Sequence, residues 1–363
     1  MQFFSRRLSD RVKKWGQAPR ERRFDGHTIN SARSQSPFLP TLAVALVFTM
    51  ILGALPAAAE TACQQVWLIS TRGVPRCGDL EGGVAEISYQ VLDPAESCRW
   101  LTSDAKAFHD SSDAAIPTTV FIHGNHIEPD VAIEEGWSLY LQMREQAACH
   151  PFRLVIWSWP SERVGLRGRP DALLKACWSD DESYLMARVL SSMKPGVPLC
   201  LIGYSFGART VGGTLELLAG GQIDGRRLSP EALAVWTSSG PRPIRAMLVA
   251  AAMDADWLSP SHRDGQAVPM VQRVLVTENG KERALRFYPH MYGRHGPQAL
   301  GRYGPIDADC GKIDVVEVSR EVGRRHNWYL YSAAAPVVDR LAWYTFTACD
   351  SAPNGPDGSS NSR

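Results

Sequence analysis

Short apolar runs alternate with longer amphipathic segments after residue 60, which predicts strands alternating with helices. The eight predicted strands are Gln65–Ser70, Glu86–Leu92, Thr118–His123, Arg153–Trp157, Pro198–Tyr204, Ala246–Ala251, Arg273–Thr277 and Ile313–Val318. The predicted amphipathic helices are Glu134–Gln146, Glu182–Met193, Phe206–Leu218 and Ala335–Thr347. This order predicts an α/β fold, in which helices cover both faces of a mostly parallel eight-stranded sheet. No helical segment separates the first two strands, so they are expected to pair antiparallel.

The remaining segments are predicted to be loops or tails. Pro160–Pro170 and Tyr288–Pro305 are rich in Gly, Pro and Arg, and the second is expected to form part of a substrate rim. The polar stretch 351–363 is expected to be disordered. The folded domain is therefore predicted to span residues 60–350.

The N-terminal segment 1–59 has the features of an export signal. Nine Lys and Arg residues precede an apolar run, Thr41–Leu55, and Ala57-Ala58-Ala59 follows it as a cleavage site. Cleavage near Glu60 would give an exported protein, periplasmic or extracellular. The basic part is about forty residues, longer than an ordinary signal, so an incorrectly assigned start codon and an uncleaved membrane anchor through residues 41–59 are the alternatives.

Composition and cysteine usage narrow the class of protein. The 363 residues are 44% hydrophobic, and 39 basic against 38 acidic residues give a net charge of +1, which provides no electrostatic case for nucleic acid. A small-molecule or lipid-like acyl substrate fits better. All eight cysteines follow the proposed cleavage site, as expected in an oxidising compartment. Cys63–Cys77 and Cys310–Cys349 are candidate bridges, whereas Cys200 lies in an apolar run and is predicted to be a buried thiol.

The candidate nucleophile is Ser205. Gly203-Tyr204-Ser205-Phe206-Gly207 follows a predicted strand and precedes a predicted helix, which is the context that a G-x-S-x-G nucleophile elbow requires. The two glycines let strand and helix pass closely while the turn lifts the hydroxyl above the sheet. The alternative is a tight strand-to-helix turn without chemistry.

A serine hydroxyl needs a histidine as base and a carboxylate that fixes the histidine tautomer. After Ser205 the chain offers His262, His290, His295 and His326. His326 is preferred because it follows the last predicted strand and precedes the last helix. For the acid, Glu282 follows the strand ending at Thr277, and Asp254 follows the one before. The later strand end is the commoner location, so Glu282 is preferred and Asp254 is the alternative.

Acyl transfer also needs donors for the oxyanion. The backbone amide of Phe206 is one, and that of Asn125, in the turn after Thr118–Ile122, is the second. The spacing His123-x-x-His126 suggests a metal site only weakly, because the turn offers no third ligand. No cofactor or metal is expected.

These segments together resemble a bacterial α/β-hydrolase family of unknown function that is related to lipases. The matching segments, within about residues 118–347, are His123-Gly124-Asn125-His126, Trp159-Pro160-Ser161, Asp180-Asp181-Glu182-Ser183, the elbow, Met253-Asp254-Ala255-Asp256 and His326-Asn327-Trp328-Tyr329. The family's D-x-A-L segment corresponds to Glu282-Arg283-Ala284-Leu285, which implies Glu282 as the acid. His126 replaces the family's asparagine, and the elbow departs from the usual H-S-M-G.

The sequence therefore predicts a serine hydrolase, esterase- or lipase-like, that acts on ester-type acyl substrates through an acyl-enzyme. The competing hypothesis is a binding protein that keeps this fold without the activity. The acidic run Asp180-Asp181-Glu182-Ser183 is interpreted as the start of a helix.

Overall fold

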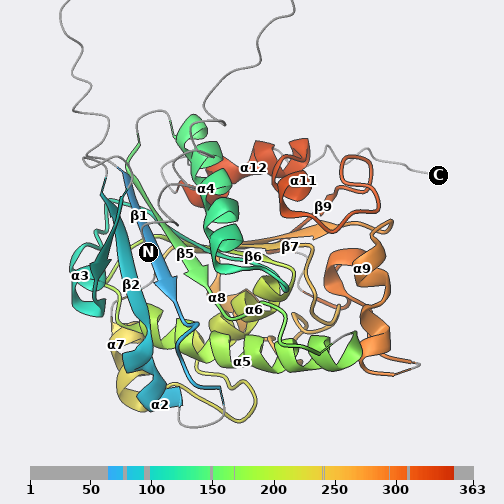
Figure 1. Cartoon of the computed structure of the whole chain (residues 1–363), viewed down its shortest axis with the longest axis horizontal. Coiled ribbons are helices and arrows are strands. Elements are labelled where there is room, and N and C mark those ends of the chain that lie inside the picture. The colour runs from blue at the N-terminus through green and yellow to red at the C-terminus, as the bar shows by residue number, and fades with distance from the viewer. Residues whose placement is uncertain are drawn as a thin grey trace, which may run out of the picture. The chain divides into compact units, whose positions relative to one another are not determined.

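A nine-stranded sheet forms the centre of the protein (Figure 1). The computed structural model describes residues 64–76, 80–93, 99–147, 150–166, 168–238, 240, 242–293, 295–308 and 311–346. The strands are β1 (Gln64–Ser70), β2 (Ser88–Asp93), β3 (Arg99–Ser103), β4 (Thr118–Ile122), β5 (Phe152–Ser158), β6 (Leu199–Tyr204), β7 (Ile244–Val249), β8 (Arg273–Glu278) and β9 (Ile313–Glu317).

The strands lie in the order β3-β2-β1-β5-β4-β6-β7-β8-β9. The seven strands that follow one another in the sheet as β1-β5-β4-β6-β7-β8-β9 are all parallel to their neighbours. In contrast, β2 is antiparallel to both β1 and β3. The antiparallel start of the sheet is as predicted. The prediction of eight strands is wrong, because β3 adds a short edge strand that pairs Tyr89 with Ser103 and Asp93 with Arg99.

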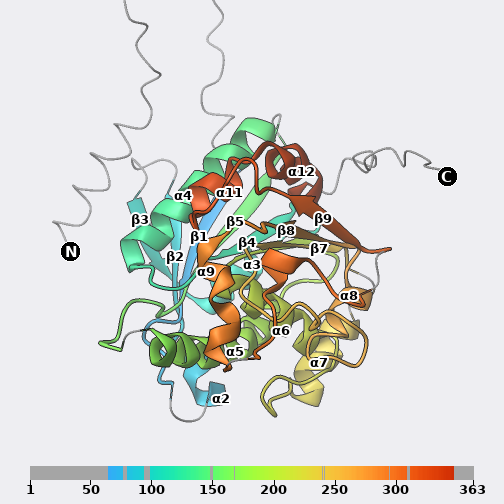
Figure 2. The same ribbon diagram turned by 90° about the vertical axis from the view of Figure 1, so that its right-hand side faces the viewer.

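Helices cover both faces of the sheet, as the alternation predicts. The longer helices are α3 (Ala105–Asp110), α4 (Pro129–Gln146), α5 (Arg169–Ser191), α6 (Phe206–Leu218), α7 (Pro230–Ser238) and α12 (Ala335–Thr345). The shorter ones are α2 (Leu80–Gly83), η1 (Val84–Glu86), α8 (Ala267–Met270), α9 (Arg283–Arg286), η2 (Tyr288–Met291), α10 (Leu300–Tyr303) and α11 (Trp328–Ser332). Figure 2 shows α4, α11 and α12 on one side of the sheet and α5, α6 and α7 on the other.

The central strands are buried on both faces, which is why they are nearly continuous apolar runs. Every residue of β4, β5, β6 and β7 is buried. Alternate side chains enter two separate cores: Val120 and Leu201 face one that includes α5 and α6, and Phe121 and Ile202 face one that includes α4, α11 and α12. The rigid centre of the sheet therefore supports the end of β6, where Ser205 follows.

The acidic run in α5 is not the start of a helix, which corrects the sequence interpretation. α5 begins at Arg169, and Asp180, Asp181 and Glu182 are buried in its middle. Glu182 accepts hydrogen bonds from Thr71 Oγ1 (2.8 Å) and Trp157 Nε1 (2.7 Å) and pairs with Arg76. These partners, which are distant in the sequence, offset the free-energy cost of burying the Glu182 carboxylate.

Several predictions concern residues outside those that the structure describes. These are the signal or anchor segment 1–59, the tail 351–363 and both candidate disulfide bridges. Within the described ranges no helix is long and apolar enough to cross a bilayer. Cys200 is a free buried thiol, as predicted, and burial raises its pKa to about 12; Cys177 is also free but exposed.

Candidate active site

Ser205 occupies a strained turn between β6 and α6. Its φ of 58° and ψ of −118° lie in a region that non-glycine residues rarely adopt. The turn is held by a hydrogen bond from the Ser205 amide to Val249 O (2.9 Å) and another from the Ala252 amide to Ser205 O (3.2 Å). The neighbouring strand therefore fixes the serine backbone in place.

The glycines on either side of Ser205 are required by close backbone contact. A Cβ at Gly203 would lie 2.4 Å from Gly207 O, and one at Gly207 would lie 2.3 Å from Ile122 O. Real Cβ atoms do not approach backbone oxygens so closely. The two glycines thus allow the start of α6 to pack closely against the ends of β6 and β4.

His326 lies beside the Ser205 hydroxyl, and Glu282 lies on the far side of the His326 ring. His326 Nε2 lies 2.8 Å from Ser205 Oγ, and His326 Nδ1 lies 2.8 Å from Glu282 Oε1. A carboxylate only accepts, so Nδ1 carries the hydrogen, and Nε2 of the neutral ring is left to accept the serine proton. The Tyr204 ring stacks on the imidazole at 5.0 Å between centroids and supports its orientation.

Glu282 is fully buried and receives three hydrogen bonds. Besides His326 it accepts from the Leu285 amide (3.1 Å), as the N-cap of α9, and from the Tyr331 hydroxyl (2.6 Å). These three donors satisfy both oxygens of the buried carboxyl group. Asn279 Nδ2 in turn donates to the Tyr331 oxygen (3.1 Å). Tyr331 and Asn279 were not identified from the sequence, although Tyr331 lies in the helix α11 that begins two residues after His326.

Asp254, the alternative acid, lies elsewhere. Its carboxylate accepts a hydrogen bond from the Tyr288 hydroxyl (2.6 Å), and burial raises its pKa, opposed in part by that bond. Of the other histidines considered, His262 lies 3.3 Å from Asp256 at the surface. The structure therefore brings Glu282 and His326, and not Asp254, to Ser205.

The two predicted oxyanion donors belong to the start of α6 and to the turn after β4. Phe206 is the first residue of α6, so its amide has no partner within the helix. A Cβ on Gly124 would lie 3.0 Å from Ser205 Cβ, which shows that the turn after β4 packs directly against the nucleophile. Asn125 follows Gly124 in this turn, and its side-chain Oδ1 accepts the His126 amide (2.9 Å).

His123 orients the peptide group that carries the Asn125 amide. The Trp159 amide donates to His123 Nε2 (3.2 Å), so the hydrogen of the neutral ring is on Nδ1, which donates to Gly124 O (2.9 Å). Burial and the nearby Arg72 lower the pKa of His123 to about 3, which keeps the ring neutral. Because the peptide is planar and trans, a fixed Gly124 carbonyl directs the Asn125 N–H the opposite way.

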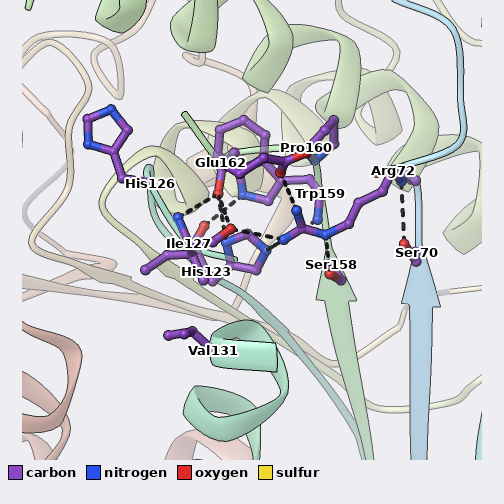
Figure 3. Close-up of polar contacts among 12 residues, drawn as sticks. Ser70, Arg72, His123, His126, Ile127, Val131, Ser158, Trp159, Pro160 and Glu162 are labelled. Atoms are coloured by element: carbon purple, nitrogen blue, oxygen red, sulfur yellow. Dashed lines mark hydrogen bonds and ion pairs between the residues drawn. The ribbon is translucent and has the colours of Figure 1, made fainter. Parts of the chain in front are cut away.

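The spacing His123-x-x-His126 does not form a metal site. Figure 3 shows the two rings pointing apart, His123 toward Trp159 and Arg72 and His126 away from them. His126 Nε2 instead lies 2.6 Å from Asp171 Oδ2. Within the described ranges no group of three or more His, Cys, Asp or Glu residues could hold a metal ion.

The segment 288–305, predicted to be a loop, contains the short helices η2 and α10, and it is anchored to α5 and α6. Arg169 Nε donates to Met291 O (2.8 Å), and Arg209 Nη1 donates to the Tyr292 hydroxyl (3.1 Å). Tyr292, which is 40% exposed, thus contacts a side chain of α6 that lies one turn after Ser205. A separate open cavity of about 1210 Å³, lined by residues such as Trp236, Arg242 and Gln266, includes none of the predicted site residues.

No family model matches the chain, and no curated protein matches it. The family resemblance noted from the sequence therefore stays a prediction. Among solved structures, the chain is similar to the catalytic core domain of acetyl xylan esterase from Trichoderma reesei, at 10% identity and a TM-score of 0.35, over 65% of this chain and 99% of that one. An iodinated complex of acetyl xylan esterase aligns at 13% identity and a TM-score of 0.33, over 63% and 96%. At such TM-scores the function must be argued from the site itself.

Proposed function

We propose that the protein is a serine hydrolase of the α/β-hydrolase fold that cleaves ester-type acyl substrates. The observation that carries the proposal is the continuous hydrogen-bonded series from Ser205 through His326 to Glu282, with both contacts at 2.8 Å. The strained turn that presents Ser205 above a parallel sheet supports the assignment of the fold. A tight turn without chemistry would need neither an aligned imidazole nor a buried carboxylate behind it.

The chemistry proceeds in two steps. Ser205 Oγ attacks the ester carbonyl carbon while its proton passes to His326 Nε2, and the amides of Phe206 and Asn125 bind the resulting oxyanion. The intermediate collapses when His326 returns the proton to the leaving alcohol, which leaves the acyl group on Ser205. Water then attacks this ester, with His326 again the base, and releases the carboxylic acid. Glu282 stabilises the imidazolium in both steps.

A fluorophosphonate probe tests the proposal against an inactive binding protein. We expect the wild-type chain to be labelled at Ser205 and to hydrolyse p-nitrophenyl acetate, and the variants Ser205→Ala and His326→Ala to lose both properties. A folded wild-type chain that is neither labelled nor active on a series of acyl chain lengths would refute it.

We further propose that the protein is exported, with residues 1–59 removed or kept as an anchor. N-terminal sequencing of the mature chain distinguishes the two, because cleavage would expose a terminus near Glu60.

A further inference from the structure

His126 is held in an unusual backbone conformation immediately after the proposed oxyanion donor. Its φ is +61°, in the left-handed region. Histidine is found there more often than most residues, but the conformation is still unfavourable and persists only where its surroundings enforce it. The turn from β4 to α4 therefore contains an enforced bend next to Asn125.

The side chain of His126 supplies one part of that enforcement. Its Nε2–H donates to Asp171 Oδ2 at 2.6 Å, and the side chains are 41% and 2% exposed respectively. Asp171 lies in the first turn of α5, and its other oxygen, Oδ1, is buried and has no hydrogen-bond partner among the residues that the structure describes. A buried carboxylate satisfied on one side only depends strongly on its single partner, so the two side chains hold each other.

The main chain of the same turn is fixed by separate contacts. The His126 amide donates to Ser161 O (2.8 Å), and the Ile127 amide donates to Ser161 Oγ (3.2 Å). Arg72 Nη2 donates to Ile127 O (3.1 Å), and Arg72 also pairs with Glu162 (Figure 3). Asn125 thus lies between a peptide fixed by His123 on one side and a clamped residue 126 on the other.

We propose that His126 and Asp171 form a positioning pair that holds the Asn125 amide toward the oxyanion. The inference rests on the proposed function, because it assigns a role in the same site. The pair connects the oxyanion turn to α5, which the backbone contacts to Ser161 do not reach. Without it the left-handed bend loses one support, and the Asn125 N–H turns away from the substrate oxygen.

The variants His126→Ala, Asp171→Ala and the double variant test the pair with p-nitrophenyl acetate as substrate and phenylboronic acid as inhibitor. An oxyanion donor acts mainly in the transition state, and its complete removal costs about 10²–10³ in kcat. We expect each single variant to lose about 10- to 100-fold in kcat with KM changed less than about threefold. Phenylboronic acid, whose tetrahedral adduct imitates the transition state, should bind more weakly by a similar factor.

Two further comparisons separate positioning from simple stabilisation. The double variant should be no worse than either single one, since both remove the same contact. His126→Asn should recover at least part of kcat, because Asn also tolerates the left-handed conformation and carries a side-chain N–H. His262→Ala is the matched control, because it removes another exposed histidine that faces a carboxylate, and it should leave kcat and KM unchanged.

The inference is overturned if folded His126→Ala, or folded Asp171→Ala should the His126 variant not fold, keeps kcat together with wild-type boronate affinity. Losses that multiply in the double variant, or a KM that rises by the factor by which kcat falls, would also overturn it. A wild-type chain without Ser205-dependent turnover would instead refute the proposed function, and the inference with it. An active wild type with unaffected variants refutes the inference alone.

Discussion

Replacing Glu282 by glutamine tests what the buried carboxylate contributes. The amide oxygen can occupy the place of Oε1, where it still accepts the Leu285 amide and His326 Nδ1–H. The amide nitrogen then faces the Tyr331 hydroxyl at the place of Oε2, and that oxygen can accept. Glu282→Gln should therefore preserve the histidine tautomer, remove the negative charge and reverse the hydrogen bond with Tyr331.

In the proposed mechanism, the lost charge is the one that attracts the imidazolium formed when Ser205 gives up its proton. Two unit charges about 4 Å apart interact by about 4 kcal/mol at an effective dielectric constant near 20. Since about 1.4 kcal/mol corresponds to tenfold, kcat should fall by about 10³ with little change in KM.

Steady-state hydrolysis of p-nitrophenyl acetate measures this loss, and Asp254→Asn is the matched control. Asp254 accepts from Tyr288 and not from His326, so its amide variant should stay within about threefold of wild type. A fall of less than tenfold in Glu282→Gln would show that the charge is not used. Complete loss, equal to that of Ser205→Ala, would show that the tautomer was not preserved.

Three other predictions concern stability, each measured as the free energy of unfolding by urea titration. Burial raises the pKa of Glu135 to about 8, so the folded state retains a proton that the unfolded state releases. Its contribution to stability is full below about pH 4.5 and falls by up to about 1.4 kcal/mol per unit until pH 8, and Glu135→Gln should remove this dependence. A difference between the two proteins that is constant with pH would contradict it. Gly203→Ala should lower the free energy of unfolding by more than about 3 kcal/mol, because the new Cβ would collide with the backbone of α6. Gly280→Ala is the control, because open space surrounds this glycine, and it should be nearly neutral. Equal effects of the two substitutions would refute the packing argument. Glu182→Ala should cost about 3–5 kcal/mol by leaving Arg76 without its buried partner, and a cost below 1 kcal/mol would refute this.

Elements with a strong local signal were predictable from the sequence. The buried central strands and α6 combine long apolar runs with the glycines of the elbow, so β4 to β8 fall close to their predicted ranges. The edge strand β3 is five residues long, with no residue fully buried, and gives little local signal. The start of α5 was missed because the partners of its buried acids are distant: Arg209 bonds to Asp180 at 2.8 Å, and Arg226 lies 3.1 Å from Asp181.

Chain order and strand ends point to Ser205, His326 and Glu282 in the sequence, and the structure brings these three side chains into contact. The choice between Glu282 and Asp254 could not be made from strand ends alone, because it depends on how the segment carrying His326 packs. The support from Tyr331 and the His126–Asp171 contact also depend on tertiary packing. In the sequence, Asp171 gives no sign that it faces a residue 45 positions earlier.

The three residues of the hydrogen-bonded series are far apart along the chain, and this separation has a consequence for biosynthesis. Ser205 emerges from the ribosome 121 residues before His326. Until β9 and α11 have been made and docked, a nascent chain carries the hydroxyl without an imidazole beside it. Acylating power would then be acquired only at the last stage of folding, so incompletely synthesised chains should remain chemically inert toward esters.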